Sequence, residues 1–175
     1  SHDASPHWKP ASEIERAKQR YRGKKIVFLV RDPRDILVSY YFQYTRRRDK
    51  EHANDAAFEG TMSDFIRHRI GGINSLLAFY NAWANQRTVP AGFLLLRYED
   101  LHADPKATFR TLIEFLNLPM ADDAMLDRVV SYCTFDNMQR IERENMLQSR
   151  RLSVIDVNDP ESFKVRKGKV AGYGE

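Results

Sequence analysis

The segment IVFLVRDPRDILVSYY, residues 26–41, constrains the fold more than any other part of the chain. Residues 26–30 are apolar without alternation and rich in β-branched side chains, a pattern typical of a central parallel strand covered on both faces. Asp32 and Pro33 then supply an N-cap and a proline for the first helical position, and apolar residues follow at helical spacing. The segment therefore predicts a strand that ends at Arg31 and turns directly into a helix.

Local signals elsewhere predict several helices and one more buried strand. Asp104 and Pro105 repeat the N-cap and first-turn pairing, and Thr61 with Asp64 is typical of another helix start. Long helical stretches between strands favour parallel pairing, so we predict an α/β fold, a parallel β-sheet flanked by helices, in one domain over 1–175. The expected segments are a polar helix over 12–21 opened by Ser12 and Glu15, helices from 61 and over 73–83, a strand over 93–96, a helix over 104–116, and irregular chain over 46–60 and 149–165.

Charge and cysteine content narrow the classes of function. The net charge of +4 is uneven, because residues 1–50 carry 13 Lys and Arg against 6 Asp and Glu. A basic first third suits nucleic acid, acidic lipid or a small phosphorylated ligand, and charge alone does not choose among them. The single cysteine, Cys133, excludes an internal disulfide and a multi-cysteine metal site; we expect a buried thiol, a reducing, cytoplasmic location and no metal. No run of 18 apolar residues predicts a membrane segment.

Arg31 stands where open α/β folds bind their ligands, at the carboxyl end of a strand. Its guanidinium, together with the hydroxyl of Ser39 eight residues later, is suited to holding a dianion such as phosphate. An ordinary structural interpretation competes with this one. Arg31 and Asp35 can form an ion pair at the helix start while Ser39 is solvated, and the spacing alone leaves both interpretations open.

Residues 31–41, RDPRDILVSYY, resemble the 3′-phosphate-binding segment of the sulfotransferases that use 3′-phosphoadenylyl sulfate (PAPS). That segment reads R-(N/D)-P-(K/R)-D-(V/I)-x-V-S-Y-Y. The resemblance implies that Arg31 and Ser39 contact the 3′-phosphate of the donor. It also implies the activity of the family, transfer of a sulfuryl group from PAPS to a hydroxyl or amine on a small-molecule or glycan acceptor.

Two further segments resemble the adenine-binding parts of the same family. Residues 93–119 resemble a strand that ends in YEDL before a helix capped by Asp-Pro, which implies that Tyr98 packs at the adenine. Residues 133–138, CTFDNM, resemble a T-S-F-x-x-M segment, which implies that Thr134 and Phe135 border the adenine. Simpler roles stay open, with Tyr98 as a core residue and Thr134 as a helix N-cap.

Near the end of the chain, Arg166, Lys167 and Gly168 resemble the R-K-G-x-x-G element that closes over the 3′-phosphate. A glycine lets the backbone approach an anion closely, and the guanidinium can clamp it. A basic stretch near a terminus is otherwise usually solvated. The chain also departs from the pattern, because Ala171 stands where the family has its second glycine.

The catalytic base and the 5′-phosphosulfate loop are the weakest parts of the resemblance. The family has a (T/S)-H segment before this strand, so Ser1-His2 implies His2 as general base, with His7 as the second choice. A frayed terminal histidine is the alternative. No loop of the type P-K-S/G-G-T-T is present, so we expect a P-loop-NTPase-like sulfotransferase fold without its first strand and that loop, a fragment inactive alone. The other histidines, His52, His68 and His102, are expected at the surface.

Two other classes of function compete with the enzyme. A catalytically silent module that binds a 3′-phosphonucleotide or a partner protein would also need no 5′-phosphosulfate loop. A nucleic-acid-binding protein could use Arg46, Arg47 and Arg48, but aromatic residues do not interleave with these cations, so we expect no nucleic acid partner. The acceptor and the oligomeric state do not follow from the sequence; residues 43–75 are expected to shape the acceptor side of the pocket.

Overall fold

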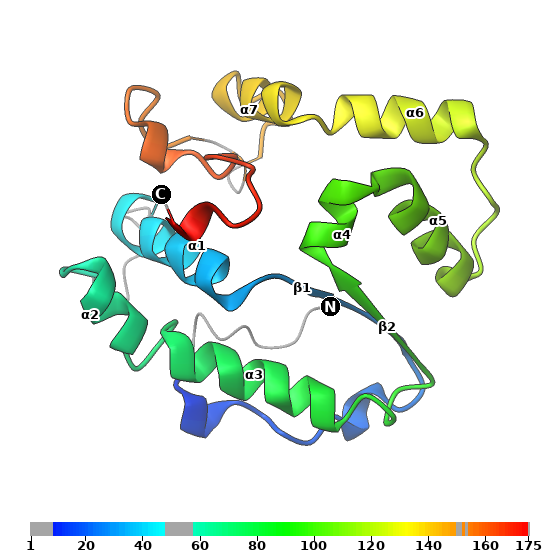
Figure 1. The fold of residues 1–175 in the computed structure, drawn as a ribbon, viewed down its shortest axis with the longest axis horizontal. Coiled ribbons are helices and arrows are strands. Elements are labelled where there is room, and N and C mark those ends of the chain that lie inside the picture. Colours follow the sequence, from blue (N-terminus) through cyan, green and yellow to red (C-terminus); the bar gives the residue numbers. More distant parts are fainter. Residues whose placement is uncertain (1–8, 48–57, 150–151, 153, 175) are drawn as a thin grey trace.

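The computed structural model describes residues 9–47, 58–149, 152 and 154–174. Helices, strands and 3-10 helices (η) alternate along the chain (Figure 1). They follow in the order η1 (Ala11–Glu13), η2 (Gln19–Tyr21), β1 (Lys25–Val30), α1 (Pro33–Arg46), α2 (Met62–Arg67), α3 (Ile73–Asn85), β2 (Gly92–Arg97), α4 (Tyr98–Ala103), α5 (Pro105–Leu116), α6 (Asp123–Tyr132), α7 (Phe135–Arg143), η4 (Pro160–Ser162) and η5 (Gly172–Gly174).

Strands β1 and β2 pair in parallel, in a register that runs from Lys25 opposite Gly92 to Val30 opposite Arg97. Helix α3 covers one face of this pair and α5 lies on the other, so the predicted α/β arrangement of parallel strands with flanking helices is confirmed (Figure 1). Both strands end at the same edge. The residues that follow them, at the starts of α1 and α4, are therefore neighbours in space.

The expectation that β1 is covered on both faces is wrong for the described part of the chain. The side chains of β1 alternate between exposed and half-buried, and Leu29 is 53% exposed. The reason is that α5 packs against β2, where the Phe115 ring lies close to Gly92, and does not extend over Leu29. An apolar run without alternation is thus compatible with a strand that has one open face.

An aromatic cluster between the strands and α3 forms the core. The ring of Phe28 contacts those of Phe79, Tyr80, Trp83 and Phe93, with centroids 5.7–5.9 Å apart. Such pairs contribute about 1 kcal/mol each beyond the area they bury. This cluster fixes the position of β1 and therefore of the residue at its end.

The helix predicted over 12–21 is wrong. The structure has the short 3-10 helices η1 and η2 joined by irregular chain, and the N-cap of η1 makes no side-chain hydrogen bond. Tertiary contacts override the local signal, because this segment packs against α3. Lys18 is completely buried, with its ammonium 4.9 Å from the centre of the Trp83 ring and donating a 2.7 Å hydrogen bond to the carbonyl of Glu15.

Two predicted helix starts are confirmed. At α2, Thr61 and Asp64 form a complete capping box. At α5, the carboxylate of Asp104 accepts a hydrogen bond from the amide of Ala107, and Pro105 occupies the first turn. These starts depend on groups within four residues of one another, so the sequence alone specifies them.

Candidate functional site

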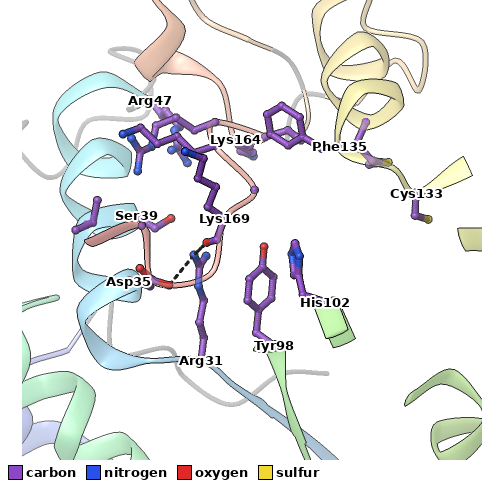
Figure 2. Close-up of a pocket in the computed structure, with 17 residues that line it drawn as sticks. Arg31, Asp35, Ser39, Arg47, Tyr98, His102, Cys133, Phe135, Lys164 and Lys169 are labelled. Atoms are coloured by element: carbon purple, nitrogen blue, oxygen red, sulfur yellow. Dashed lines mark hydrogen bonds and ion pairs between the residues drawn. The ribbon is translucent and has the colours of Figure 1, made fainter. Parts of the chain in front are cut away.

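A cavity of about 280 Å³ lies beyond the carboxyl ends of the two strands. Its walls come from α1, α4, the start of α7 and the C-terminal residues 164–172 (Figure 2). Seven of the eight predicted donor-binding residues line it: Arg31, Ser39, Tyr98, Phe135, Arg166, Lys167 and Gly168. Segments more than 130 residues apart in sequence therefore meet at one cavity.

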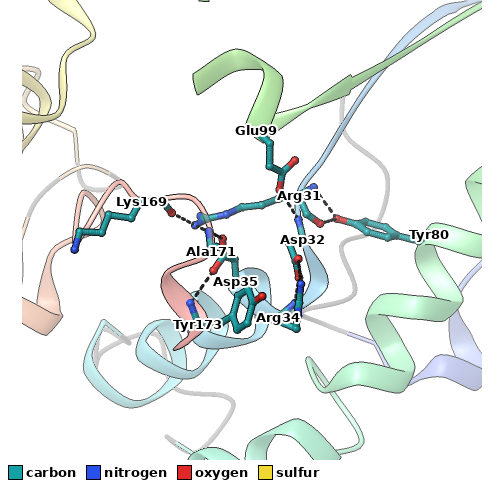
Figure 3. Close-up of polar contacts among 9 residues, drawn as sticks. All are labelled: Arg31, Asp32, Arg34, Asp35, Tyr80, Glu99, Lys169, Ala171 and Tyr173. Carbon is teal, nitrogen blue, oxygen red and sulfur yellow. Dashed lines mark hydrogen bonds and ion pairs between the residues drawn. The ribbon is translucent and has the colours of Figure 1, made fainter. Parts of the chain in front are cut away.

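Arg31 is held in place from several sides. Its Nη2 donates hydrogen bonds to Oδ2 of Asp35, at 3.1 Å, and to the carbonyl of Lys169, at 2.8 Å. Its backbone is fixed from α3, because the Tyr80 hydroxyl accepts from the Arg31 amide and donates to the Arg31 carbonyl (Figure 3). The ion pair with Asp35 is therefore formed, and the same arginine lines the cavity.

The backbone that follows Arg31 is held by a carboxylate from the neighbouring strand end. Oε1 of Glu99 accepts a 2.8 Å hydrogen bond from the Asp32 amide. Burial acts to raise the pKa of Glu99, but hydrogen bonds from backbone amides outweigh it, and the net shift is downward. The Asp32 pKa is also lowered, chiefly by a hydrogen bond from the Arg34 side chain. Both carboxylates therefore favour the charged form.

Asp35 joins α1 to the end of the chain. Its side chain is 2% exposed, and its oxygens accept hydrogen bonds from the amides of Ala171 and Tyr173, each at 3.0 Å (Figure 3). Ala171 has φ of 58°, the left-handed conformation that favours glycine. The chain adopts this conformation although alanine replaces the expected glycine.

Glu142 of α7 accepts backbone hydrogen bonds in the same way as Asp35, at the other end of residues 164–173. It is 1% exposed, and its two oxygens accept hydrogen bonds from the amides of Lys164, at 2.7 Å, and Val165, at 2.8 Å. Asp35 and Glu142 thus hold both ends of residues 164–173, which we call the basic segment. Between these two ends, Arg166, Lys167, Gly168 and Lys169 lie along the cavity wall.

Gly168 is required by close packing. Its φ is 58°, and a Cβ at this position would overlap the ring of Phe135. The glycine therefore allows the basic segment to approach the start of α7. This is the close approach expected of the glycine in the R-K-G pattern, although here the neighbour is an aromatic ring.

Tyr98 and His102 form a pair of rings on one face of α4, with centroids 4.5 Å apart, and both line the cavity. The guanidinium of Arg31 lies 4.2 Å from the centre of the Tyr98 ring. Burial raises the pKa of the Tyr98 phenol, and the charge of Arg31 opposes this shift. His102 is exposed, as expected of a surface residue, and it also lines the cavity. Its spacing of four from Tyr98 on a helix was the signal that could have placed it here.

The predictions for Cys133, Thr134 and the two N-terminal histidines had other outcomes. Cys133 is exposed at the cavity wall rather than buried, because it caps the end of α6 and does not lie on an inward helical face. Thr134 occupies the N-cap position of α7 but does not line the cavity, and its hydroxyl donates to the carbonyl of Ser131. His2 and His7 lie outside the described residues.

The cavity is strongly cationic. Among the described residues, one carboxylate, that of Asp35, and six basic side chains line it: Arg31, Arg47, Lys164, Arg166, Lys167 and Lys169. Among the described residues, no group of three or more His, Cys, Asp or Glu side chains is arranged to hold a metal ion. A polyanion bound directly by cations and amides is the chemistry that fits these walls.

A second cavity, about 510 Å³, lies on the α3 side of the strands. Its walls include Phe28, Tyr80, Phe93 and Leu95, and of the predicted site residues that the structure describes only Arg31 reaches it. The described residues that were predicted to bind the anion therefore gather at the smaller cavity. No helix in the described part of the chain is long and apolar enough to cross a membrane.

Comparisons with known proteins agree on one family. The sequence profile described as "Sulfotransferase domain" matches residues 18–173. Cytosolic sulfotransferase 10 of Arabidopsis thaliana is 28% identical over 156 residues, which cover 85% of this chain and 44% of that protein. Flavonol 3-sulfotransferase of Flaveria bidentis is 26% identical over 144 residues, covering 78% of this chain and 43% of that protein. The chain thus spans less than half the length of these relatives.

Solved structures show the same fold. A mouse sulfotransferase complexed with PAP superimposes with a TM-score of 0.62 at 18% identity, covering 86% of this chain and 51% of that one. Retinol dehydratase in a complex with retinol and PAP gives a TM-score of 0.62 at 22% identity, covering 86% of this chain and 42% of that one. The profile match over nearly the whole chain and the strand-to-helix junction at Arg31 lead to one conclusion: this protein belongs to the sulfotransferase domain family.

Proposed function

We propose that this chain binds the adenosine 3′-phosphate part of PAPS and belongs to an enzyme that transfers the sulfuryl group to a hydroxyl or amine. One observation carries the proposal. Arg31, Ser39 and the basic segment border a single cavity that also has aromatic walls. Clustered cations beside aromatic rings suit a phosphorylated nucleoside, because the cations bind the phosphate and the rings stack on the base.

The 3′-phosphate would lie between α1 and the basic segment. Arg31 would bind it from the junction between β1 and α1, Ser39 from α1, and Arg166 and Lys167 from the opposite wall. Buried guanidinium donors bind a dianion more strongly than solvated ones, because the local dielectric constant is lower. The Nε of Arg31 supports this assignment, since it is buried and has no hydrogen-bond partner among the described residues.

The adenine would lie beside Tyr98 and Phe135. Both rings line the cavity from different elements, and aromatic side chains contribute about 1–3 kcal/mol per stacked base. Thr134 adjoins Phe135 but lies outside the wall, so we assign the base contact to the two rings. His102, next to Tyr98, extends this surface.

The chemical step would be an in-line displacement at sulfur. The acceptor oxygen or nitrogen forms a bond to sulfur, the bond from sulfur to the 5′-phosphate oxygen breaks, and a base takes the acceptor proton. His2 is our proposed base, although it lies outside the described residues. Since the sequence contains no loop of the 5′-phosphosulfate type, we assign donor recognition to this chain and propose the full activity for the whole protein.

The relatives favour a small-molecule acceptor over a glycan. Flavonol 3-sulfotransferase is named for a flavonol, and two retinol dehydratase complexes contain retinol or androsterone. All of these carry apolar rings or chains, so we propose an apolar acceptor with a hydroxyl group. The single cysteine supports a cytoplasmic location for this protein.

Thermal unfolding with two nucleotides tests the proposal. Adenosine 3′,5′-bisphosphate should raise the melting temperature of the chain well above the shift given by AMP, because only the former carries a 3′-phosphate. Arg31→Ala should abolish the difference. Arg34→Ala is the matched control, since Arg34 lies only three residues from Arg31, in the first turn of α1, but outside this cavity, and it should keep the difference. Equal shifts with both nucleotides for the unmodified chain would refute the proposal.

A further inference from the structure

Arg47 is a cation of the cavity that the family pattern does not explain. It caps the end of α1 and lines the same wall as Ser39. Its Nε is buried and has no hydrogen-bond partner among the described residues. A buried guanidinium usually has its donors satisfied, so an open one that faces a cavity points to a missing acceptor.

The surroundings of Arg47 supply charge of the same sign. Burial first, and then the guanidinium of Arg166, lower the pKa of Arg47, although Glu142 and Glu161 act in the opposite direction. Those two carboxylates are already engaged. Glu142 accepts from two backbone amides, and Glu161 is paired with Arg166 at 2.9 Å. An anion between the two guanidinium groups would relieve their repulsion.

Position separates Arg47 from the proposed 3′-phosphate site. Arg47 follows Ser39 by eight positions, which corresponds to a rise of about 12 Å along a helix. In Figure 2, Arg31 and Arg47 lie at opposite ends of the cavity wall, with Ser39 between them. Arg166 lies toward the Arg47 end, because its guanidinium is 4.3 Å from the centre of the Phe42 ring, one turn beyond Ser39. Two separate anions fit this wall better than one.

We infer that Arg47 forms a second oxyanion subsite together with Arg166, whose guanidinium is shared between this subsite and the proposed 3′-phosphate. The subsite takes a carboxylate, sulfate or phosphate group. The first anion, at Arg31 and Ser39, is the 3′-phosphate only if the proposed function holds. The second oxyanion has two possible sources, an acidic group on the acceptor or the other phosphate of the nucleotide. An arginine pair suits either, since each planar guanidinium can donate two parallel hydrogen bonds to an oxyanion.

Inorganic phosphate is the probe for this subsite. Calorimetric titration of the chain saturated with adenosine 3′-monophosphate should show one further phosphate bound. Arg47→Gln should weaken this phosphate binding at least tenfold and change nucleotide affinity less than twofold. Arg46→Gln is the matched control, because Arg46 is exposed and carries the same charge, and it should bind phosphate normally. Equal losses in both variants, or no bound phosphate in the unmodified chain, would overturn the inference.

Repeating the titration with adenosine 3′,5′-bisphosphate identifies the source. Continued phosphate binding assigns the subsite to an acidic acceptor, and its disappearance assigns it to the second phosphate of the nucleotide; both results support the subsite.

If neither nucleotide binds, the proposed function fails, and the subsite is tested on the free chain. There, phosphate binding should depend on Arg47 and not on Arg31. Arg47→Lys keeps the positive charge but loses the paired N–H donors of the guanidinium, so it should bind phosphate with intermediate affinity. This variant tests the subsite if Arg47→Gln does not fold.

Discussion

At the scale of single residues, the site depends on buried carboxylates that bind protein rather than ligand. Asp35 accepts hydrogen bonds from Arg31 and from two backbone amides of the basic segment. A carboxylate can satisfy all three donors because both of its oxygens accept. An amide of the same shape cannot, because one of its two polar groups is a donor.

Replacing Asp35 by asparagine should therefore destabilise the protein and weaken ligand binding. We expect a loss of about 3 kcal/mol in the free energy of unfolding, the size typical of breaking a buried ion pair. Affinity for adenosine 3′,5′-bisphosphate should fall at least tenfold, as measured by calorimetry. Asp64→Asn, in the exposed capping box of α2, should leave this affinity intact. Unchanged affinity in Asp35→Asn would contradict the role given to Asp35.

Glu99 makes stability depend on pH. Its pKa is lowered in the folded state, because backbone hydrogen bonds outweigh the effect of burial. A lowered pKa means that the stabilisation is present above the unfolded value, about 4.3, and is lost as pH falls through the folded value. Urea unfolding between pH 6 and pH 3 should show that Glu99→Gln loses about 1 kcal/mol at pH 6 and less at pH 3. A loss that is the same at both pH values would contradict this assignment.

At the scale of elements, the basic segment has no regular structure between its attachment points and depends on them for its position. Glu142→Gln should release its start, costing about 2 kcal/mol and speeding hydrogen exchange at the amides of Lys164 and Val165. Glu144→Gln changes an exposed glutamate two residues away and should do neither. Unaltered exchange at these amides in Glu142→Gln would show that other contacts hold the segment.

Elements whose signals are local could be predicted from the sequence. The strand-to-helix junction at Arg31 and the capped starts at Thr61 and Asp104 depend on nearby residues, and all three are confirmed. The segment around Lys18 could not be predicted, because its conformation depends on packing against α3. The place of Arg47 in the cavity was missed for a similar reason, because composition describes its charge and only the fold decides which way the side chain points.

At the scale of the whole molecule, the parallel pair of strands presents apolar surface. Leu29 is 53% exposed and Leu95 is 54% exposed, and such surface promotes association. The substitutions Leu29→Thr and Leu95→Thr should each change the free energy of unfolding by only about 0.5 kcal/mol. The double variant should show less self-association when measured by light scattering. Leu76→Thr, at a residue only 1% exposed, should cost about 3 kcal/mol. Unchanged association in the double variant would show that another surface is responsible.

The attachment of the basic segment to Asp35 also sets an order of events during synthesis. The sheet strand and α1 leave the ribosome long before Ala171, which follows Asp35 by 136 positions. Until then, Arg31 is the described side-chain partner available to Asp35, and one wall of the cavity does not exist. The proposed ligand binding is therefore gained only when residues 164–173 dock. A protease that cuts within 164–173 should remove the proposed binding while leaving the aromatic core between the strands and α3 in place.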